Sequence, residues 1–394
     1  MANYIDLFSG CGGLSLGLKN AGWNGLFAIE KNKDAFKTFK YNLLDANHHF
    51  NWPEWLSKEN HDINEVIEKF EENLIKLQGK VDLIVGGPPC QGFSLAGKRL
   101  EDDKRNTLVH AYIKFVKLVK PKMIFFENVH GFTIPFEQDK IPFSVVVKEE
   151  LKKLGYFLKD EIIDVSKLGV PQKRKRFILI GSLENNVNDF FVNLKKDSIN
   201  FLTRKGLSSE VTIDNAISDL QKKHGIYISE EFKKFVFGEY GEHISGYEKY
   251  MSRDSGVRPD SHRFANHKPA TIELFEYLSS LSDNSLRMTP KKDKTNRLKK
   301  RSVTILKKGV ICGTITSIPD DYIHYCEPRI MTVREMARIQ SFPDSFKFLG
   351  KYTSGGKERK KDVPRYTQIA NAVPPLFAEQ VGIQLLKLVG EVNE

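Results

Sequence analysis

Short runs of apolar residues alternate with helix-like segments along the first 180 or so residues of the chain. The runs have the length of strands, and their continuous apolar character is typical of strands buried on both faces of a sheet. They lie at residues 4–8, 26–29, 81–85, 123–126 and 176–180. Helices are expected between them, for example at 14–20, 33–44, 63–77 and 108–119. This alternation predicts a doubly wound α/β domain with a parallel sheet.

The pattern becomes looser after about residue 200. Residues 222–302 are mainly polar, and basic side chains cluster at 291–301 and again at 351–361. A charged run is ordinarily a solvated surface, but two basic stretches after a sheet domain also suit a module that faces nucleic acid. The last apolar segment, 375–389, predicts a helix that packs on a core.

Composition narrows the class of protein. The chain has 394 residues, of which 40% are hydrophobic, so it can build packed cores and is not a disordered polymer. A usual size of about 150 residues per domain favours two domains. No run approaches the ~18 apolar residues of a membrane span, and the N-terminus has no secretion signal, so a cytoplasmic protein is expected. The net charge of +11 is compatible with a polyanionic partner.

A glycine-containing turn, residues 9–13, follows the first strand and leads into a helix. Glycines let the backbone approach a ligand closely, and a helix N-terminus offers unpaired N–H groups. Ser15 stands where a dinucleotide-binding motif would have its third glycine, which weakens a pyrophosphate site. Glu30, at the end of the second strand, can accept hydrogen bonds from ribose hydroxyls. The pattern favours a nucleoside cofactor without pyrophosphate; the alternative is a structural turn beside a surface acid.

Cys90 lies in the Gly/Pro-rich turn 86–94, which follows the strand at 81–85. Open α/β sheets bind their ligands at the carboxyl ends of strands, and a thiol in a turn made rigid by prolines can be activated as thiolate. A lone cysteine is more often a buried filler, but these turn residues favour a functional one. The other cysteines have no comparable setting, and no pair has metal-type spacing.

Two further strand ends carry polar side chains suited to catalysis. Glu127 follows the run 123–126, so its carboxyl group is expected on the same rim as Cys90 and partly removed from water, which favours the protonated form. Strand alternation points Arg174 and Arg176 to the same side, where they can bind anionic or carbonyl oxygens. The alternatives are a surface or helix-capping acid and an exposed basic edge strand.

Taken in order, these segments resemble the sequence blocks of the cytosine-5 DNA methyltransferases, especially those of bacterial restriction–modification systems. The likeness covers the sheet domain and roughly the last 70 residues. His61 and Ala370 stand where the family usually has glycine. The matching segments are 6–13, Glu30, 62–63, 88–91, 127–129, 172–176, 329–343 and 368–375.

The resemblance implies a Rossmann-like sheet that binds S-adenosylmethionine, formed by residues 1–200 and 365–394, and a smaller target-recognition domain with a hinge in 201–364. It implies no metal. Phe8 matches an aromatic residue near the adenine, Glu30 the ribose-binding acid, and Asp62 an adenine contact. The residues expected at the cofactor are Phe8, Ser9, Gly10, Cys11, Gly12, Gly13, Glu30, Asp62, Ile63, Pro88, Asn371 and Ala372.

The same resemblance implies that Cys90 attacks carbon 6 of cytosine and that protonated Glu127 hydrogen-bonds ring N3. Arg176 is expected to contact the base carbonyl and Arg174 to support a phosphate. The substrate is double-stranded DNA, from which the target base must flip out. A monomer of the bacterial cytosol that works alongside a restriction endonuclease is expected.

Three alternatives remain open on the sequence alone. A tRNA-modifying branch shares the fold and the blocks, although the Cys-Phe-Thr element usual in that branch is missing from this chain. A catalytically silent DNA-binding homologue is the second alternative, which intact Cys90, Glu127, Arg174 and Arg176 oppose. The third is an NAD-dependent oxidoreductase, which the incomplete glycine motif opposes.

Overall fold

The computed structural model describes residues 1–89, 106–135, 141–230, 232–281, 285–293, 298, 302–354 and 362–390. The chain forms two compact units. The first, here called the sheet unit, comprises Met1–Val165, Arg174–Ile199 and Phe377–Glu394. The second unit comprises Ser166–Lys173 and Asn200–Leu376. The chain therefore crosses between the units at 165/166, 173/174, 199/200 and 376/377.

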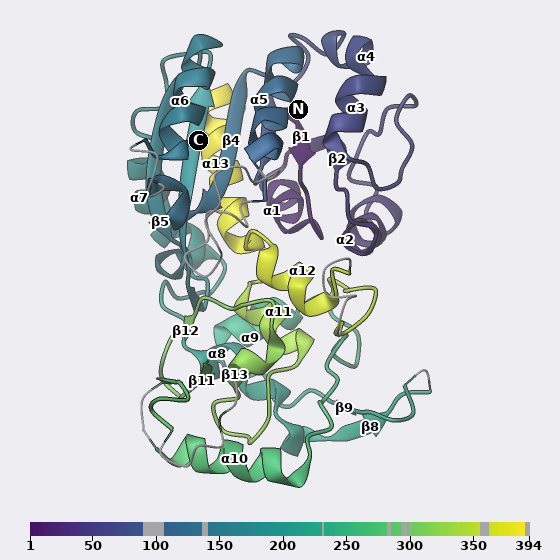
Figure 1. Cartoon of the computed structure of the whole chain (residues 1–394), viewed down its shortest axis with the longest axis vertical. Helices are drawn as coiled ribbons and strands as arrows, with labels where there is room; N and C mark the ends of the chain where they lie inside the picture. Colours follow the sequence, from purple (N-terminus) through teal and green to yellow (C-terminus); the bar gives the residue numbers. More distant parts are fainter. Residues whose placement is uncertain are drawn as a thin grey trace. The chain divides into compact units, whose positions relative to one another are not determined.

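A six-stranded sheet with the order β2-β1-β3-β4-β7-β5 is the centre of the sheet unit (Figure 1). β1 pairs in parallel with β2 and β3, and β3 with β4, so the carboxyl ends of these four strands lie at one edge. The five strands expected from the apolar runs are confirmed, because each run overlaps a strand of this sheet. The strands are β1 (Asn3–Leu7), β2 (Asn24–Ile29), β3 (Leu83–Gly86), β4 (Met123–Val129), β5 (Phe157–Asp164) and β7 (Lys175–Ser182).

The expectation of a wholly parallel sheet is wrong. β7 runs antiparallel to both of its neighbours, β4 and β5. Only residues 165–174 connect β5 to β7, and parallel neighbours need a crossover of a dozen or more residues, usually a helix. The apolar pattern does not reveal β5, because this strand lies at the sheet edge and most of its side chains are at least partly exposed.

Helices build the main apolar core of the sheet unit against the strands. Side chains of α3, α4, α5 and α6 pack with those of β1 to β4 and β7 in one cluster. The last helix, α13 (Pro375–Val389), has the bounds that the sequence predicts, and its Gly382 carbonyl accepts a hydrogen bond from Trp23 Nε1 at 2.9 Å. The other helices of this unit are α1 (Gly13–Ala21), α2 (Lys33–Phe39), α3 (Ile63–Lys69), α4 (Glu71–Ile75), α5 (Asn106–Val119) and α6 (Phe143–Lys153), and α7 (Phe190–Arg204) crosses into the second unit.

The second unit consists of short elements, which explains why the sequence pattern loosens there. A three-stranded sheet, β10-β11-β13, packs with α10 (Pro269–Ser280) around a small apolar core. Its strands are β10 (Leu286–Met288), β11 (Val303–Ile305) and β13 (Tyr322–Ile323). The remaining elements are β6 (Gln172–Lys173), α8 (Ile213–Ile217), β8 (Ile226–Ile228), β9 (Val236–Gly238), α9 (Gly246–Ser252), β12 (Cys312–Gly313), α11 (Val333–Ile339) and α12 (Arg365–Asn371). None of the helices in the described ranges is long and apolar enough to cross a membrane.

Candidate active site

The loop from β1 to α1 adopts a tight backbone path in which Phe8 and two glycines have left-handed backbone angles. Phe8, Gly10 and Gly12 have positive φ angles of 59°, 56° and 98°. A Cβ added at Gly12 would lie 2.7 Å from Leu43 Cδ1, so glycine is required for close packing as well as for its backbone angle. Ser9 N–H donates to the Ile29 carbonyl at 3.1 Å, which fixes the loop to the end of β2. The predicted residues 8–13 therefore form one rigid turn at the carboxyl edge of the sheet.

Glu30 closes one side of this turn. Its Oε2 accepts a hydrogen bond from Gly10 N–H at 2.9 Å, and its Oε1 accepts one from Asn32 N–H at 2.6 Å. Burial raises the pKa of Glu30, and these N–H donors oppose that effect. The carboxylate is thus part of the loop and not a loose surface acid. Its remaining lone pairs are available to ribose hydroxyls.

Asp62 and Ile63 lie beside Glu30, because His61 N–H donates to the Glu30 carbonyl at 2.9 Å. Asp62 begins α3 by accepting a hydrogen bond from Asn64 N–H at 2.9 Å, and it also pairs with Lys31 Nζ at 2.7 Å. Burial alone would raise the pKa of Asp62, but the hydrogen bonds from Lys31 and Asn64 hold it below its usual value. Ile63 is buried in the main core. The structure therefore brings the predicted segments 8–13, 30 and 62–63 together.

Asp6 is a buried acid that belongs to the matched segment 6–13 but is not among the residues expected at the cofactor. Its Oδ2 accepts a short hydrogen bond of 2.5 Å from Ser15 Oγ, and burial raises the pKa of Asp6 to about 7. Asp6 Oδ1 and Ser9 Oγ are buried without a hydrogen-bond partner in the described part of the chain. Unpaired buried polar atoms beside a turn of this kind fit a polar ligand such as the cofactor. An acid inside an otherwise apolar strand is the sequence signal that identifies Asp6.

Cys11 has a structural environment. Its thiol is buried, and burial raises its pKa to about 12. A thiol in that state is not a nucleophile at neutral pH, so Cys11 belongs to the loop through its backbone. Cys90 lies outside the described residues, which end at Pro89 on that side and resume at 106.

The turn that leads toward Cys90 is bound to the end of β4. Asn128 Nδ2 donates to the Pro88 carbonyl at 3.2 Å. Glu127 Oε2 lies 2.9 Å from the place where a Cβ of Gly87 would stand, so only glycine lets the carboxylate lie against this turn. Gly87 and Asn128 are two positioning residues to which the sequence analysis assigned no role. The structure thus brings Glu127 and Pro88 to the same rim.

Glu127 also meets Arg176. Arg176 Nε lies 2.9 Å from Glu127 Oε1, and both side chains are mostly buried, with 13% and 14% exposed. The antiparallel register pairs Val129 with Arg176, which puts Glu127 and Arg176 diagonally opposite on one face. Glu127 is therefore neither a surface acid nor a helix cap.

Arg174 lies just before β7, and its carbonyl accepts a hydrogen bond from Val165 N–H at 3.1 Å. Its side chain is buried, with 3% exposed. β7 itself lies between β4 and β5. The alternative of an exposed basic edge strand at 174–176 is therefore wrong.

Asn371 and Ala372, the last two predicted cofactor residues, belong to the second unit. The Ala372 carbonyl accepts a hydrogen bond from Gln340 Nε2 at 2.5 Å, and Gln340 Oε1 accepts one from Gln172 Nε2 at 2.5 Å. All three of these bonded groups are buried or nearly so. This chain of amides links three of the predicted sequence blocks within one unit.

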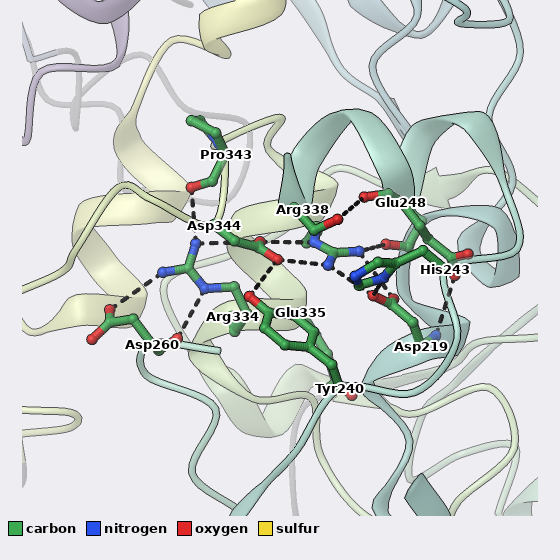
Figure 2. A network of polar contacts seen from close by, with 12 residues as sticks. Asp219, Tyr240, His243, Glu248, Asp260, Arg334, Glu335, Arg338, Pro343 and Asp344 are labelled. Atoms are coloured by element: carbon green, nitrogen blue, oxygen red, sulfur yellow. Dashed lines mark hydrogen bonds and ion pairs between the residues drawn. The ribbon is translucent and has the colours of Figure 1, made fainter. Parts of the chain in front are cut away.

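The block at 329–343 forms a buried ionic network around α11, part of which is drawn in Figure 2. Arg338 lies between two carboxylates, with contacts of 2.9 Å to Asp219 Oδ2 and 2.6 Å to Asp344 Oδ2. Arg334 donates to the Asp260 and Pro343 carbonyls at 2.9 and 3.1 Å. Both arginine side chains are fully buried, so they support the second unit and do not face a ligand.

Residues 2–387 match the sequence profile of the C-5 cytosine-specific DNA methylases. This chain belongs to that family. The family resemblance stated on the sequence is confirmed.

Known relatives agree with this assignment. A Type II methyltransferase, M.DdeI, of Desulfomicrobium norvegicum is 31% identical over 99% of this chain and 90% of its own length. M.XorII of Xanthomonas oryzae is 30% identical over 99% of this chain and 86% of its own length. A solved DNA modification methyltransferase from an E. coli prophage shares the fold, with a TM-score of 0.66 at 24% identity and coverage of 99% and 100%.

Family membership and the curated relatives make the chain a DNA (cytosine-5-)-methyltransferase that uses S-adenosylmethionine as methyl donor. Its fold, a mixed α/β sheet of the Rossmann-like methyltransferase type with a smaller second unit, fits that activity. Its substrate is DNA. The tRNA, silent-homologue and oxidoreductase alternatives are not supported.

Proposed function

We propose that this methylase modifies a flipped cytosine within one specific duplex sequence, and that Cys90, Glu127, Arg174 and Arg176 form its catalytic centre. The observation that carries the proposal is the position of Glu127. Its two carboxylate oxygens lie against Gly87, in the turn that leads to Cys90, and against Arg176. An acid fixed between a nucleophile turn and a guanidinium is suited to bind the polar edge of a base.

Carbon 5 of cytosine is a weak nucleophile, and covalent addition of a thiolate overcomes this weakness. The Cys90 thiolate forms a bond to carbon 6, and the electron pair of the 5,6 double bond becomes available at carbon 5. S-adenosylmethionine, when bound, would supply an electrophilic methyl group to that carbon, and its sulfur would be left as a neutral thioether. A base then removes the proton from carbon 5, the 5,6 double bond re-forms, and the Cys90 thiolate leaves.

Glu127 donates a hydrogen bond to ring N3 and binds the exocyclic amine, which stabilises the charge that develops during addition. Arg176 orients the Glu127 carboxyl group through the 2.9 Å contact and binds the base carbonyl. Arg174 supports the phosphate of the target strand. Pro88 keeps the nucleophile turn rigid through the contact of its carbonyl with Asn128.

The cofactor binds at the turn that follows β1. Glu30, oriented by Gly10 and Asn32 N–H groups, accepts hydrogen bonds from the ribose hydroxyls. Asp62 contacts the adenine and Phe8 packs near it, while the polar atoms of Asp6 and Ser9 gain partners. The cofactor site further includes Cys11, Gly12, Gly13 and Ile63.

We assign catalysis and cofactor binding to residues 1–200 and 365–394, and target recognition with a hinge to 201–364. The Type II names of the relatives support a role in protecting host DNA beside a restriction endonuclease. A monomer in the bacterial cytosol fits this role.

Trapping on duplex DNA that contains 5-fluorocytosine tests the proposal. Fluorine replaces the carbon 5 proton and cannot be removed by a base, so Cys90 cannot be released after methyl transfer. The wild-type chain should therefore form a stable covalent adduct in the presence of S-adenosylmethionine. Cys90→Ser should form none while it still binds the cofactor. Glu161→Gln, on the sheet edge, is the control and should form the adduct as wild type does. An adduct with Cys90→Ser would refute the assignment of the nucleophile.

A further inference from the structure

The three-stranded sheet of the second unit has one packed face and one polar face. Arg287 of β10 lies directly opposite Thr304 of β11 in an antiparallel pair. Neighbouring residues on a strand point to opposite faces, so Arg287 and Thr304 share the face that turns away from the core. Arg287 is exposed and Thr304 is half-buried. The side chains on the other face, packed with α10, are Leu286, Met288, Val303, Ile305 and Ile323.

The Arg287 guanidinium makes few contacts that stabilise this unit. It donates one hydrogen bond, of 3.2 Å, to the Ser302 hydroxyl, and it pairs with no carboxylate among the residues that the structure describes. A guanidinium has five N–H donors in a planar fork, so most of these donors face solvent. This distinguishes Arg287 from Arg338, which is fully buried between two acids.

Two further cations follow β10. Lys291 and Lys292 are exposed, and neither forms an ion pair within the described ranges. Asp293, the next residue, is buried and accepts a hydrogen bond from Leu298 N–H at 2.7 Å. The antiparallel pair of β10 and β11, here called the β10–β11 ribbon, thus has three exposed cations, Arg287, Lys291 and Lys292, on or just after β10.

We propose that the β10–β11 ribbon enters the major groove of the substrate DNA, where Arg287 recognises a guanine of the target sequence and Lys291 and Lys292 contact flanking phosphates. β11 also pairs with β13, but β10 is the edge strand of this sheet, so the edge pair of β10 and β11 can be presented to the major groove, whose width admits two strands. Arginine binds guanine O6 and N7 in a bidentate manner. Lysine contacts with phosphate position the protein without selecting a base. The inference rests on the proposed function, because it names the side chain that selects the sequence.

Methylation of a duplex pool with randomised bases around each cytosine, followed by bisulfite sequencing, tests the inference. The sequences that the wild-type enzyme methylates in this pool define its preferred target. Arg287→Gln should lose preference for guanine at one position by on the order of 5- to 150-fold, the range of a bidentate contact, and should gain preference for adenine there. The other positions should be unchanged. Arg253→Gln, an exposed arginine on the same unit with 43% of its side chain exposed, is the control and should keep the wild-type preference.

The lysines have a different expected effect. Combined Lys291→Gln and Lys292→Gln should weaken binding to all sequences alike and reduce the salt dependence by a slope of about two. An unchanged sequence preference in Arg287→Gln, or an equal loss on every sequence, would overturn the assignment. If the wild-type chain itself methylated no duplex, the proposed function would fail instead, so the two failures are distinguishable.

Discussion

Replacing Arg338 with methionine should destabilise the second unit strongly. The guanidinium donates to both oxygens of Asp219 at 3.0 and 2.9 Å and to both oxygens of Asp344 at 2.8 and 2.6 Å. It also donates to the Ala216 carbonyl at 3.1 Å. Methionine has a similar length but no donor. It would leave Asp344 with only the longer contact of 3.6 Å to Arg334 Nη1, and Asp219 with the 2.7 Å contact to His243 Nδ1.

Removal of one partner from a buried ion pair costs about 3–5 kcal/mol. Here one substitution removes the cation from two carboxylates and a donor from one carbonyl, so the free energy of unfolding should fall by at least about 5 kcal/mol. That is a large part of the roughly 5–15 kcal/mol that stabilises a typical domain.

The loss of unfolding free energy in the Arg338→Met variant should also depend on pH. In the wild type, burial alone would raise the pKa of Asp344, but Arg338 holds it below its usual value. Burial already raises the pKa of Asp219 in the wild type, against the opposing effect of Arg338. Without Arg338, the pKa of Asp219 should rise further, and that of Asp344 should rise as burial is opposed mainly by Arg334. Such groups stabilise the fold at low pH and lose that contribution as the pH rises. The variant should therefore be closer to wild type at pH 5 than at pH 8.

Urea unfolding at the two pH values measures these effects. Far-UV circular dichroism reports both units, whereas tryptophan fluorescence reports the sheet unit, because Trp23, Trp52 and Trp55 all lie there. Adding Asp219→Asn and Asp344→Asn to the variant should restore part of the stability, since neutral amides need no cation. A loss below about 1 kcal/mol, or an equal loss at pH 5 and pH 8, would show that the network is not electrostatically coupled as argued.

Four further predictions concern the sheet unit and the pH dependence of folding. Gly87→Ala should reduce turnover but preserve cofactor affinity, because the new Cβ would lie 2.9 Å from Glu127 Oε2; isothermal titration and initial rates separate the two. Glu127→Gln should lower turnover by about 10²- to 10⁴-fold with cofactor affinity unchanged, and an unaltered rate would remove it from the centre. Burial lowers the pKa of His262 to about 4. The free energy of unfolding of the wild type should therefore fall by up to about 1.4 kcal/mol per pH unit as the pH drops from about 6.5 to 4. In urea titrations, His262→Gln should show a smaller dependence on pH over this range. Burial raises the pKa of Asp6 to about 7, so the contribution of Asp6 to stability is complete below about pH 4 and is lost as the pH rises through 7. In thermal unfolding, the melting temperature of Asp6→Asn minus that of the wild type should therefore be higher at pH 8 than at pH 5.

Strands and site residues differed in how well the sequence revealed them. Buried central strands such as β1 and β4 have continuous apolar runs, so their positions could be predicted. The direction of β7 could not be predicted, because this direction depends on the short connection from β5 and not on the residues of the strand itself. The proximity of Glu30 to residues 8–13 could also be predicted, because both segments follow parallel strands whose carboxyl ends lie at one edge of the sheet.

Other features of the site depend on contacts that no local pattern encodes. The need for glycine at 87 arises from a carboxylate some 40 residues later in the chain. The exposure of Arg287 and the burial of Arg338 differ because of tertiary packing, although both are arginines in short elements of the second unit. Sequence blocks identified the chemistry, whereas packing decided which charged side chains remain available to a ligand.

The division of the chain within residues 172–176 has a consequence for engineering new specificities. Gln172 belongs to the second unit, where it bonds with Gln340, whereas Arg174 and Arg176 belong to the sheet unit. A graft that exchanged only 200–376 between two such enzymes would leave the donor's Gln340 opposite the host's Gln172 and the host's β6 opposite the donor's β12. A chimera built with both segments, 166–173 and 200–376, keeps those partners together. Its four junctions then fall where the chain itself passes from one unit to the other.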